Sequence, residues 1–176
     1  MAYDVIVLGS GPGGYPAAIR ASQLGFKVAI IEKESLGGVC LNWGCIPTKA
    51  LIKSANVFEY MKHSAAYGIN ASGTADFGAV IKRSRGVADK MSKGVQFLMR
   101  KNKIDVIMGY GKIKAKGQVE VTVADGSKQI VEAKNIIIAT GGRAKQLPNL
   151  PIDGKKIIGY RDAMVLPQQP KSMIIV

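Results

Sequence analysis

The feature that most restricts the fold of this chain is a glycine-rich loop directly after its first apolar run. "VIVLG" leads into "GSGPGG", residues 9–14, and a helix-forming stretch, "YPAAIRASQL", follows it. "KVAII", residues 27–31, is a second short apolar run. A strand–helix–strand unit of this kind almost always winds right-handed and places its strands parallel in one sheet. The sequence therefore predicts an α/β fold with a parallel sheet.

The loop has the spacing G-x-G-x-x-G. Gly9 permits the turn out of the strand, Gly11 leaves room for a pyrophosphate, and Gly14 lets helix and strand approach closely. The free amides at the helix N-terminus favour an anion there. Glu32, at the end of the second strand, is placed to accept hydrogen bonds from a ribose diol, although alone it could be a solvent-facing charge. Together these residues predict a dinucleotide site and do not distinguish FAD from a nicotinamide.

Two further helices are expected. The first should run from about Cys45 to Met61, with one apolar face. The second, over residues 76–103, combines apolar residues at helical spacing with a basic face. Gly86 and Gly94 should interrupt its regularity, because glycine is a poor helix former.

Strands are expected after residue 104. Apolar and polar residues alternate through four segments, and "ADGS", residues 124–127, is typical of a hairpin turn. This pattern predicts an inserted antiparallel β-meander. "NIIIA", residues 135–139, is apolar almost throughout and predicts another strand of the parallel sheet.

The composition changes after residue 143. "KQLPNLPIDG" and "VLPQQPK" are rich in proline and polar residues, as linkers are. "SMIIV", residues 172–176, has the pattern of a buried strand. Because chains seldom end inside a core strand, we expect one domain over 1–148, a linker with the first strand of a second domain over 149–176, and a longer parent protein.

The net charge of +13 suggests nucleic acid or a membrane surface as a partner. Much of this charge lies in the predicted helix over 76–103, and no stacking aromatics are interleaved with it, which argues against nucleic acid. No apolar run approaches the ~20 residues needed to span a bilayer. No signal peptide precedes the first strand. We therefore expect a soluble, cytoplasmic protein without a membrane partner.

The two cysteines lie five residues apart in "GGVCLNWGCIPTK". In a straight helix the Cα atoms of Cys40 and Cys45 would stand ~8.6 Å apart, whereas a disulfide spans at most ~6.8 Å. A bond between them therefore requires an irregular backbone, which Gly44 and the pair Gly37–Gly38 permit. Such a bond would be readily reduced and would stabilise little, since its loop is short. The pair is better suited to redox work than to structure.

Other interpretations of the cysteines stay open. Zinc needs four ligands, and the chain has one histidine, His63, so no metal site is expected. Two inert buried thiols are the remaining alternative. Lys49 follows Cys45 by one helical turn, where its charge could lower the pKa of a thiol or pair with an electron-rich ring. Without that neighbour it would be interpreted as an exposed helix lysine.

The segment "GGVCLNWGCIPTK" resembles the redox-active stretch of the FAD-dependent pyridine-nucleotide disulfide oxidoreductases. "GSGPGG", Glu32, "GYGKI" (residues 109–113) and "IIIATGG" (residues 136–142) come in the order of that family. With "GYGKI", the cysteine segment is most similar to the members that oxidise dihydrolipoyl groups. The resemblance implies a Rossmann-like FAD-binding domain over 1–148 and the start of an NAD-binding domain in 149–176.

The resemblance also implies roles for single residues. Cys45 would lie against the flavin ring, and Cys40 would exchange with dihydrolipoyl groups. Electrons would then pass to FAD and on to NAD. Lys49 would lie near the flavin N5, and the family often has serine in place of Gly142. The implied cofactor-binding residues are Gly9, Gly11, Gly13, Gly14, Glu32, Lys33, Gly38, Lys49, Gly111, Thr140, Gly141 and Gly142.

The partners implied are lipoyl groups of a 2-oxo acid dehydrogenase complex or of the glycine cleavage system. Members of this family are homodimers, and the catalytic histidine–glutamate pair comes from a C-terminal domain that this chain lacks. The chain alone is therefore predicted to be inactive. Alternatives are a glutathione- or mercuric-reductase-like flavoprotein of the same family, or a non-catalytic basic binding module.

Overall fold

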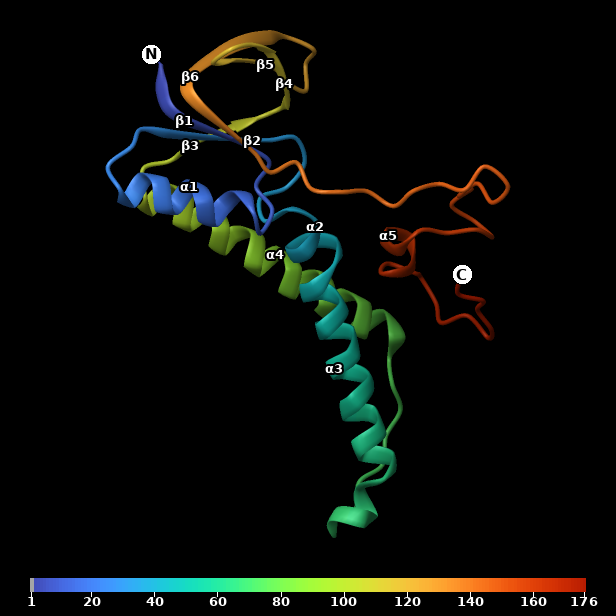
Figure 1. Cartoon of the computed structure of the whole chain (residues 1–176). Coiled ribbons are helices and arrows are strands. Elements are labelled where there is room, and N and C mark those ends of the chain that lie inside the picture. The colour runs from blue at the N-terminus through green and yellow to red at the C-terminus, as the bar shows by residue number, and fades with distance from the viewer. Residues whose placement is uncertain (1) are drawn as a thin grey trace. The chain divides into compact units, whose positions relative to one another are not determined.

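The computed structural model describes residues 2–176, which divide into two compact units. The first unit comprises the residues up to Asn42 together with Asp89–Arg143. The second comprises Trp43–Ala88 and Ala144–Val176. The first unit holds the sheet, and the second is mostly helix and extended chain (Figure 1).

The first unit is built on a six-stranded sheet. Its strands are β1 (Tyr3–Leu8), β2 (Val28–Glu32), β3 (Asp105–Met108), β4 (Tyr110–Ala115), β5 (Gln118–Thr122) and β6 (Lys128–Ile138). They lie side by side in the order β3-β2-β1-β6-β5-β4. β1, β2, β3 and the second half of β6 are parallel, whereas β4, β5 and the first half of β6 are antiparallel.

The two faces of the parallel sheet are covered differently. Side chains alternate between the faces of a strand. Ile6 and Leu8 of β1 and Ile31 of β2 pack in one buried cluster with Val119 and Val121 of β5. The meander therefore covers this face, and Figure 1 shows helix α1 (Gly14–Gln23) on the opposite side of the strands. Covering on both faces explains why β1 and β2 are apolar runs rather than alternating ones.

The predicted α/β fold, with a parallel sheet and an antiparallel meander, is confirmed. Two details of the prediction are wrong. Residues 105–108 pair in parallel with β2 instead of joining the meander. The segments "KQIVEA" and "NIIIA" form one continuous strand, β6. In its first half, which pairs with β5, apolar and polar residues alternate because one face is solvated. Its second half, which pairs with β1, is apolar because it lies inside the parallel sheet. The change of neighbouring strand within β6 therefore resembles, in the sequence, a boundary between two strands.

The remaining helices are α2 (Gly38–Trp43), α3 (Cys45–Lys62), the 3₁₀ helix η1 (Ser64–Tyr67), α4 (Phe77–Lys101) and α5 (Tyr160–Ala163). The helix predicted from Cys45 is confirmed. The interruption predicted at Gly86 and Gly94 is wrong, because α4 is continuous. Each glycine costs about 1 kcal/mol relative to alanine. The buried face of the helix, with Val95 and Met99 almost fully enclosed, outweighs that cost.

The end of the chain differs from the sequence prediction. Residues 172–176 form no strand, and Ile174, Ile175 and Val176 are 91%, 88% and 96% exposed. A strand needs a neighbour for its backbone hydrogen bonds, and within residues 2–176 no strand pairs with this segment. The predicted division between residues 148 and 149 stays a prediction.

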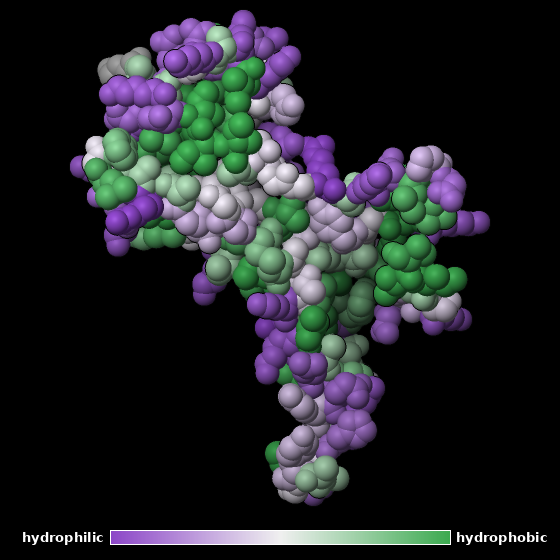
Figure 2. Space-filling view, in the orientation of Figure 1, coloured by the Kyte–Doolittle hydropathy of each residue, from purple (hydrophilic) through white to green (hydrophobic). Residues whose placement is uncertain are grey.

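Two surface properties complete the fold. Figure 2 shows hydrophobic side chains gathered on the surface of the sheet region, and the exposed isoleucines of β4 and β6 are Ile113, Ile130, Ile137 and Ile138. Hydrophobic surface gathered as Figure 2 shows is typical of a contact surface. Among residues 2–176, no helix combines the length and apolar character that crossing a lipid bilayer requires.

Candidate active site

The glycine loop connects β1 to α1, and its glycines are required by close approach. Gly9 has φ +95°, and a Cβ there would overlap the carbonyl oxygen of Ala139. A Cβ on Gly14 would overlap the carbonyl oxygen of Gly9. The helix thus begins directly against the strand, as the spacing predicts.

The tip of the loop is open. The nearest atom to a Cβ built on Gly11 is the Cα of Gly38, 3.9 Å away. Gly13, with φ −82°, precedes the first residue of α1 and offers no side chain to its amides. Bare backbone at the N-terminus of a ten-residue helix is the kind of surface that accepts a pyrophosphate. The loop therefore fits a dinucleotide.

Glu32 is held at the end of β2 and is only 8% exposed. Its Oε2 accepts hydrogen bonds from the Ser10 amide at 3.0 Å and from the Ser10 hydroxyl at 2.6 Å. Its Oε1 accepts one from the Glu34 amide at 2.9 Å. The neighbouring Lys33 is exposed, with its Nζ 5.8 Å from the centre of the Tyr110 ring.

The segment that carries the cysteines begins against the loop. Gly38, the first residue of α2, has φ +60°, and a Cβ there would stand 2.6 Å from the Cα of Gly11. The Gly37 amide donates to the Ser10 carbonyl oxygen at 3.1 Å. Asn42 is buried, and its Nδ2 donates to the carbonyl oxygens of Leu36 at 3.0 Å and Gly38 at 2.9 Å. The helix that carries Cys40 is therefore fixed at its start to the glycine loop.

The backbone breaks between the two cysteines. α2 ends at Trp43 and α3 begins at Cys45, while Gly44 has the non-helical angles φ −145° and ψ −114°. Both cysteines are disulfide-bonded, and the chain has two, so Cys40 is joined to Cys45. The irregular turn predicted from helix geometry is confirmed.

The start of α3 presents the second cysteine with a nearby cation. Cys45 and Lys49 are both exposed and lie four residues apart on this helix, so they are one turn apart on the same face.

Trp43, the one tryptophan of the chain, has the Arg85 guanidinium 4.2 Å and the Arg161 guanidinium 5.2 Å from its ring centroid.

The other predicted cofactor residues lie at strand ends. A Cβ on Gly9 would stand 3.2 Å from the Cα of Thr140, so the segment after β6 borders the loop. Gly141 and Gly142 follow in exposed chain. Gly111 of β4 is explained by packing, because a Cβ there would stand 2.9 Å from Leu8 Cδ2. Its contact with adenine stays a prediction.

The sequence as a whole points to one family. The pattern of the family described as pyridine nucleotide-disulphide oxidoreductase matches residues 3–176. The chain belongs to this family. The structure is also similar to that of LpdA from Mycobacterium tuberculosis, with a TM-score of 0.85 and 26% identity, covering 93% of this chain and 37% of that one.

Relatives of known name agree with this assignment to the disulphide oxidoreductases. The dihydrolipoyl dehydrogenase of Zymomonas mobilis is 50% identical over 175 residues, which are 99% of this chain and 38% of that protein. The dihydrolipoyl dehydrogenase of Bacillus subtilis is 44% identical over 183 residues, covering 99% of this chain and 39% of that protein. The chain thus spans less than two fifths of the length of these relatives.

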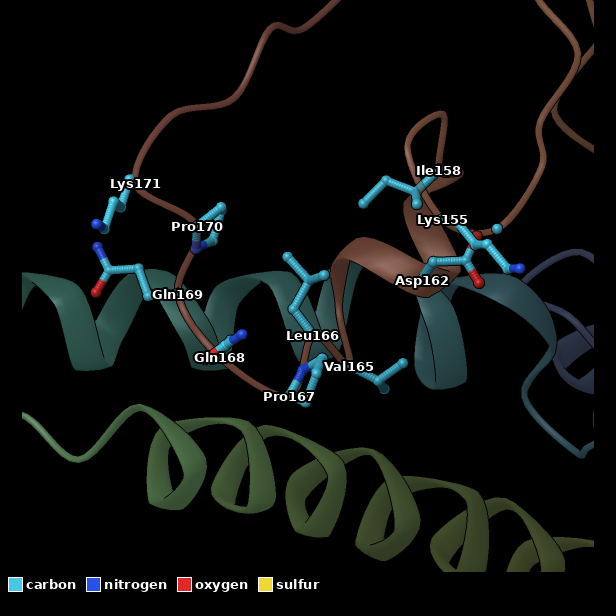
Figure 3. Close-up of a pocket in the computed structure, with 11 residues that line it drawn as sticks. Lys155, Ile158, Asp162, Val165, Leu166, Pro167, Gln168, Gln169, Pro170 and Lys171 are labelled. Carbon is cyan, nitrogen blue, oxygen red and sulfur yellow. The ribbon is translucent and has the colours of Figure 1, made fainter.

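A cavity of about 620 Å³ lies in the C-terminal part of the second unit. Figure 3 shows Val165, Leu166 and Pro167 in its wall, with the polar side chains of Asp162 and Gln168 beside them. Its lining residues all fall within 154–171, so none of the residues expected for oxidoreductase chemistry contributes to it.

Sequence reasoning missed two features of this oxidoreductase site. Ser10 is an unspecified position of the glycine motif and received no role from the sequence, although its side chain is fully buried and bonded to Glu32. The motif itself gave no signal, because any small residue satisfies the spacing. The arginines that flank Trp43 come from distant segments, and no local pattern brings them together.

Proposed function

We propose that this chain forms the flavin-binding and disulfide-bearing part of a dihydrolipoamide dehydrogenase. The observation that carries the proposal is the Cys40–Cys45 disulfide, borne by a helix whose first residue lies against the glycine loop. The family membership and the dihydrolipoyl dehydrogenase relatives support it. A disulfide on a helix that begins against a dinucleotide loop argues against the alternative of a non-catalytic basic binding module.

FAD is the cofactor that these residues fit. The open backbone of Gly11 and Gly13 would take the pyrophosphate, and Glu32 would accept from the adenosine ribose. The segment of Thr140, Gly141 and Gly142 borders the loop and would line the path of the cofactor. When bound, FAD supplies an acceptor for an electron pair and a donor of hydride to NAD. The chain's own part is to hold the cofactor and to present the disulfide.

The disulfide reacts by thiol exchange. A thiolate of the dihydrolipoyl group attacks the Cys40 sulfur, which breaks the Cys40–Cys45 bond and leaves Cys45 as a thiolate. The second substrate thiol then displaces Cys40 and closes the lipoyl disulfide. Two electrons have moved from the substrate to the cysteine pair; one of the two substrate protons is held by the Cys40 thiol and the other is released to solvent, so that Cys45 stays a thiolate. Lys49, one turn beyond Cys45, places a positive charge on the side where that thiolate forms.

The remaining functions are proposed for the part of the relatives that this chain does not match. That part would bind NAD, supply the catalytic base and form a homodimer. The lipoyl groups would be those of a 2-oxo acid dehydrogenase complex or of the glycine cleavage system. A cytoplasmic location suits the cycle, because thiols stay reduced there.

Alkylation and mass spectrometry test the choice of substrate. The chain is incubated with dihydrolipoamide, with glutathione, or with no thiol, and is then alkylated with iodoacetamide. Dihydrolipoamide is expected to expose two alkylatable cysteines at concentrations at which glutathione exposes few, because a dithiol closes its own ring and completes the exchange. Equal reduction by glutathione at matched thiol concentration would contradict the dihydrolipoyl assignment and favour a glutathione-reductase-like member.

A further inference from the structure

Ser10 is the one residue of the glycine loop whose side chain bonds to a predicted cofactor residue. It has no exposed surface. Its hydroxyl lies 2.6 Å from Glu32 Oε2 and 3.4 Å from the Ser35 carbonyl oxygen. A hydroxyl carries a single proton, so it donates to the nearer, charged acceptor. The Ser10 amide donates to the same Oε2 at 3.0 Å.

These bonds divide the two oxygens of Glu32 into different roles. An ionised carboxylate offers about four acceptor positions, two on each oxygen. Ser10 occupies both positions of Oε2, and the Glu34 amide occupies one position of Oε1. One position remains, and it is on Oε1. Ser10 thereby decides which oxygen of Glu32 is left for a ligand.

We propose that Ser10 is a positioning residue of the adenosine-binding site, which fixes Glu32 so that Oε1 accepts a ribose hydroxyl. The proposal rests on the proposed function, in which Glu32 accepts from the ribose. Ser10 contacts no reacting atom and acts through the carboxylate. Without the serine hydroxyl, Oε2 loses its shortest hydrogen bond and has a vacant acceptor position, and two backbone amides alone then hold the carboxylate against rotation about its last bond.

The difference in affinity between a ligand with ribose hydroxyls and one without them tests this role, because a residue that only supports the fold would change both affinities equally. ADP carries both hydroxyls, and 2′,3′-dideoxy-ADP lacks both. In the unaltered chain, ADP is expected to bind about tenfold more tightly, the equivalent of one hydrogen bond to a charged group. Ser10→Ala should lower the affinity for ADP by roughly fivefold and the affinity for the dideoxy ligand by less than about twofold. Only the binding of ADP depends on the orientation of Glu32.

The experiment is a calorimetric titration of both ligands into the chain and its variants. Ser84→Ala is the matched control, because Ser84 is also fully buried and its hydroxyl donates to a backbone oxygen, that of Ile81, at 2.9 Å. The control should keep the preference for ADP. If Ser10→Ala does not fold by circular dichroism, Ser10→Gly, which also lacks the hydroxyl, takes its place.

Two results would overturn the proposal, and they differ in scope. If Ser10→Ala or Ser10→Gly weakens both ligands equally, Ser10 only supports the loop, and the ribose role of Glu32 survives. If the unaltered chain shows no preference between the two ligands, Glu32 does not accept from ribose, and the adenosine site of the proposed function fails with it.

Discussion

At the scale of single residues, the site depends on positions where a side chain has no room. Gly38 combines a left-handed backbone with a close approach of the cysteine helix to Gly11 of the glycine loop. The sequence predicted that the glycines of this segment permit an irregular backbone. It could not predict that Gly38 lies on Gly11, because that contact joins two segments that are separate in sequence.

Gly38→Ala is expected to lower the free energy of unfolding by roughly 2–4 kcal/mol. The left-handed backbone costs an L-residue about 1–2 kcal/mol, and a Cβ 2.6 Å from the Gly11 Cα forces the backbones apart. Urea unfolding measures the change. Gly13→Ala is the control, since its φ is −82° and the nearest atom to its Cβ is 3.9 Å away. Equal losses in the two variants would contradict the packing described.

The two cysteines are expected to differ in the FAD-loaded chain. Cys40→Ser should retain a long-wavelength absorption band, the signature of a thiolate beside a flavin, because Cys45 is still present. Cys45→Ser should lack the band. The two variants are compared by their visible absorption spectra at wavelengths longer than the flavin absorption maximum. The reverse pattern would exchange the roles proposed for Cys40 and Cys45.

At the scale of elements, sequence patterns predicted the three long helices and the strands of the sheet but not the short helices α2, η1 and α5. Two of the errors share one cause. Burial overrode the propensity of glycine in α4, and a change of partner within β6 had the pattern of a boundary between strands. Both depend on what packs against the element. The break between α2 and α3 was predictable, because helix geometry alone forbids a disulfide across it.

Gly86→Ala and Gly94→Ala are each expected to stabilise the protein by about 0.5–1 kcal/mol. Both lie within α4, and a Cβ at either position meets no atom within 4 Å. Alanine therefore gains helix propensity without a clash. Thermal unfolding gives the change. Gly68→Ala is a sharp control, because its Cβ also meets nothing but its φ is +70°, so it should destabilise.

The meander should contribute to the pH dependence of stability through Glu120. Lys128 and Lys114 each stand 3.2 Å from its carboxylate, and these hydrogen bonds lower the pKa of Glu120. The contribution is full above the usual glutamate pKa and is lost as the pH falls through the lowered one. Glu120→Gln should therefore differ from the unaltered chain near neutral pH and converge with it in acid, in urea titrations. A constant difference would contradict this role.

At the scale of the whole molecule, the chain holds two units and covers less than two fifths of its named relatives. The sequence predicted the flavin-type fold and the redox pair, since both are local motifs. It did not predict the exposed end of the chain correctly, because whether residues 172–176 form a strand depends on neighbours outside the segment.

The chain alone is expected to perform one half-reaction and no turnover. With FAD and dihydrolipoamide it should consume about one equivalent of dithiol and reduce its disulfide. With NAD added, the absorbance of NADH at about 340 nm should not rise steadily, because the proposed NAD site and catalytic base lie in the unmatched part of the relatives. Sustained NADH formation would show that this chain is sufficient for the whole reaction.

The central claim is that the Cys40–Cys45 disulfide exchanges electrons beside a flavin held by the glycine loop. The most direct measurement is the visible spectrum of the chain titrated first with FAD and then with dihydrolipoamide. The account predicts protein-bound flavin bands, followed by a new long-wavelength band as the dithiol is added. Failure to retain FAD, or a bound-flavin spectrum that reduction of both cysteines leaves unchanged, would contradict it.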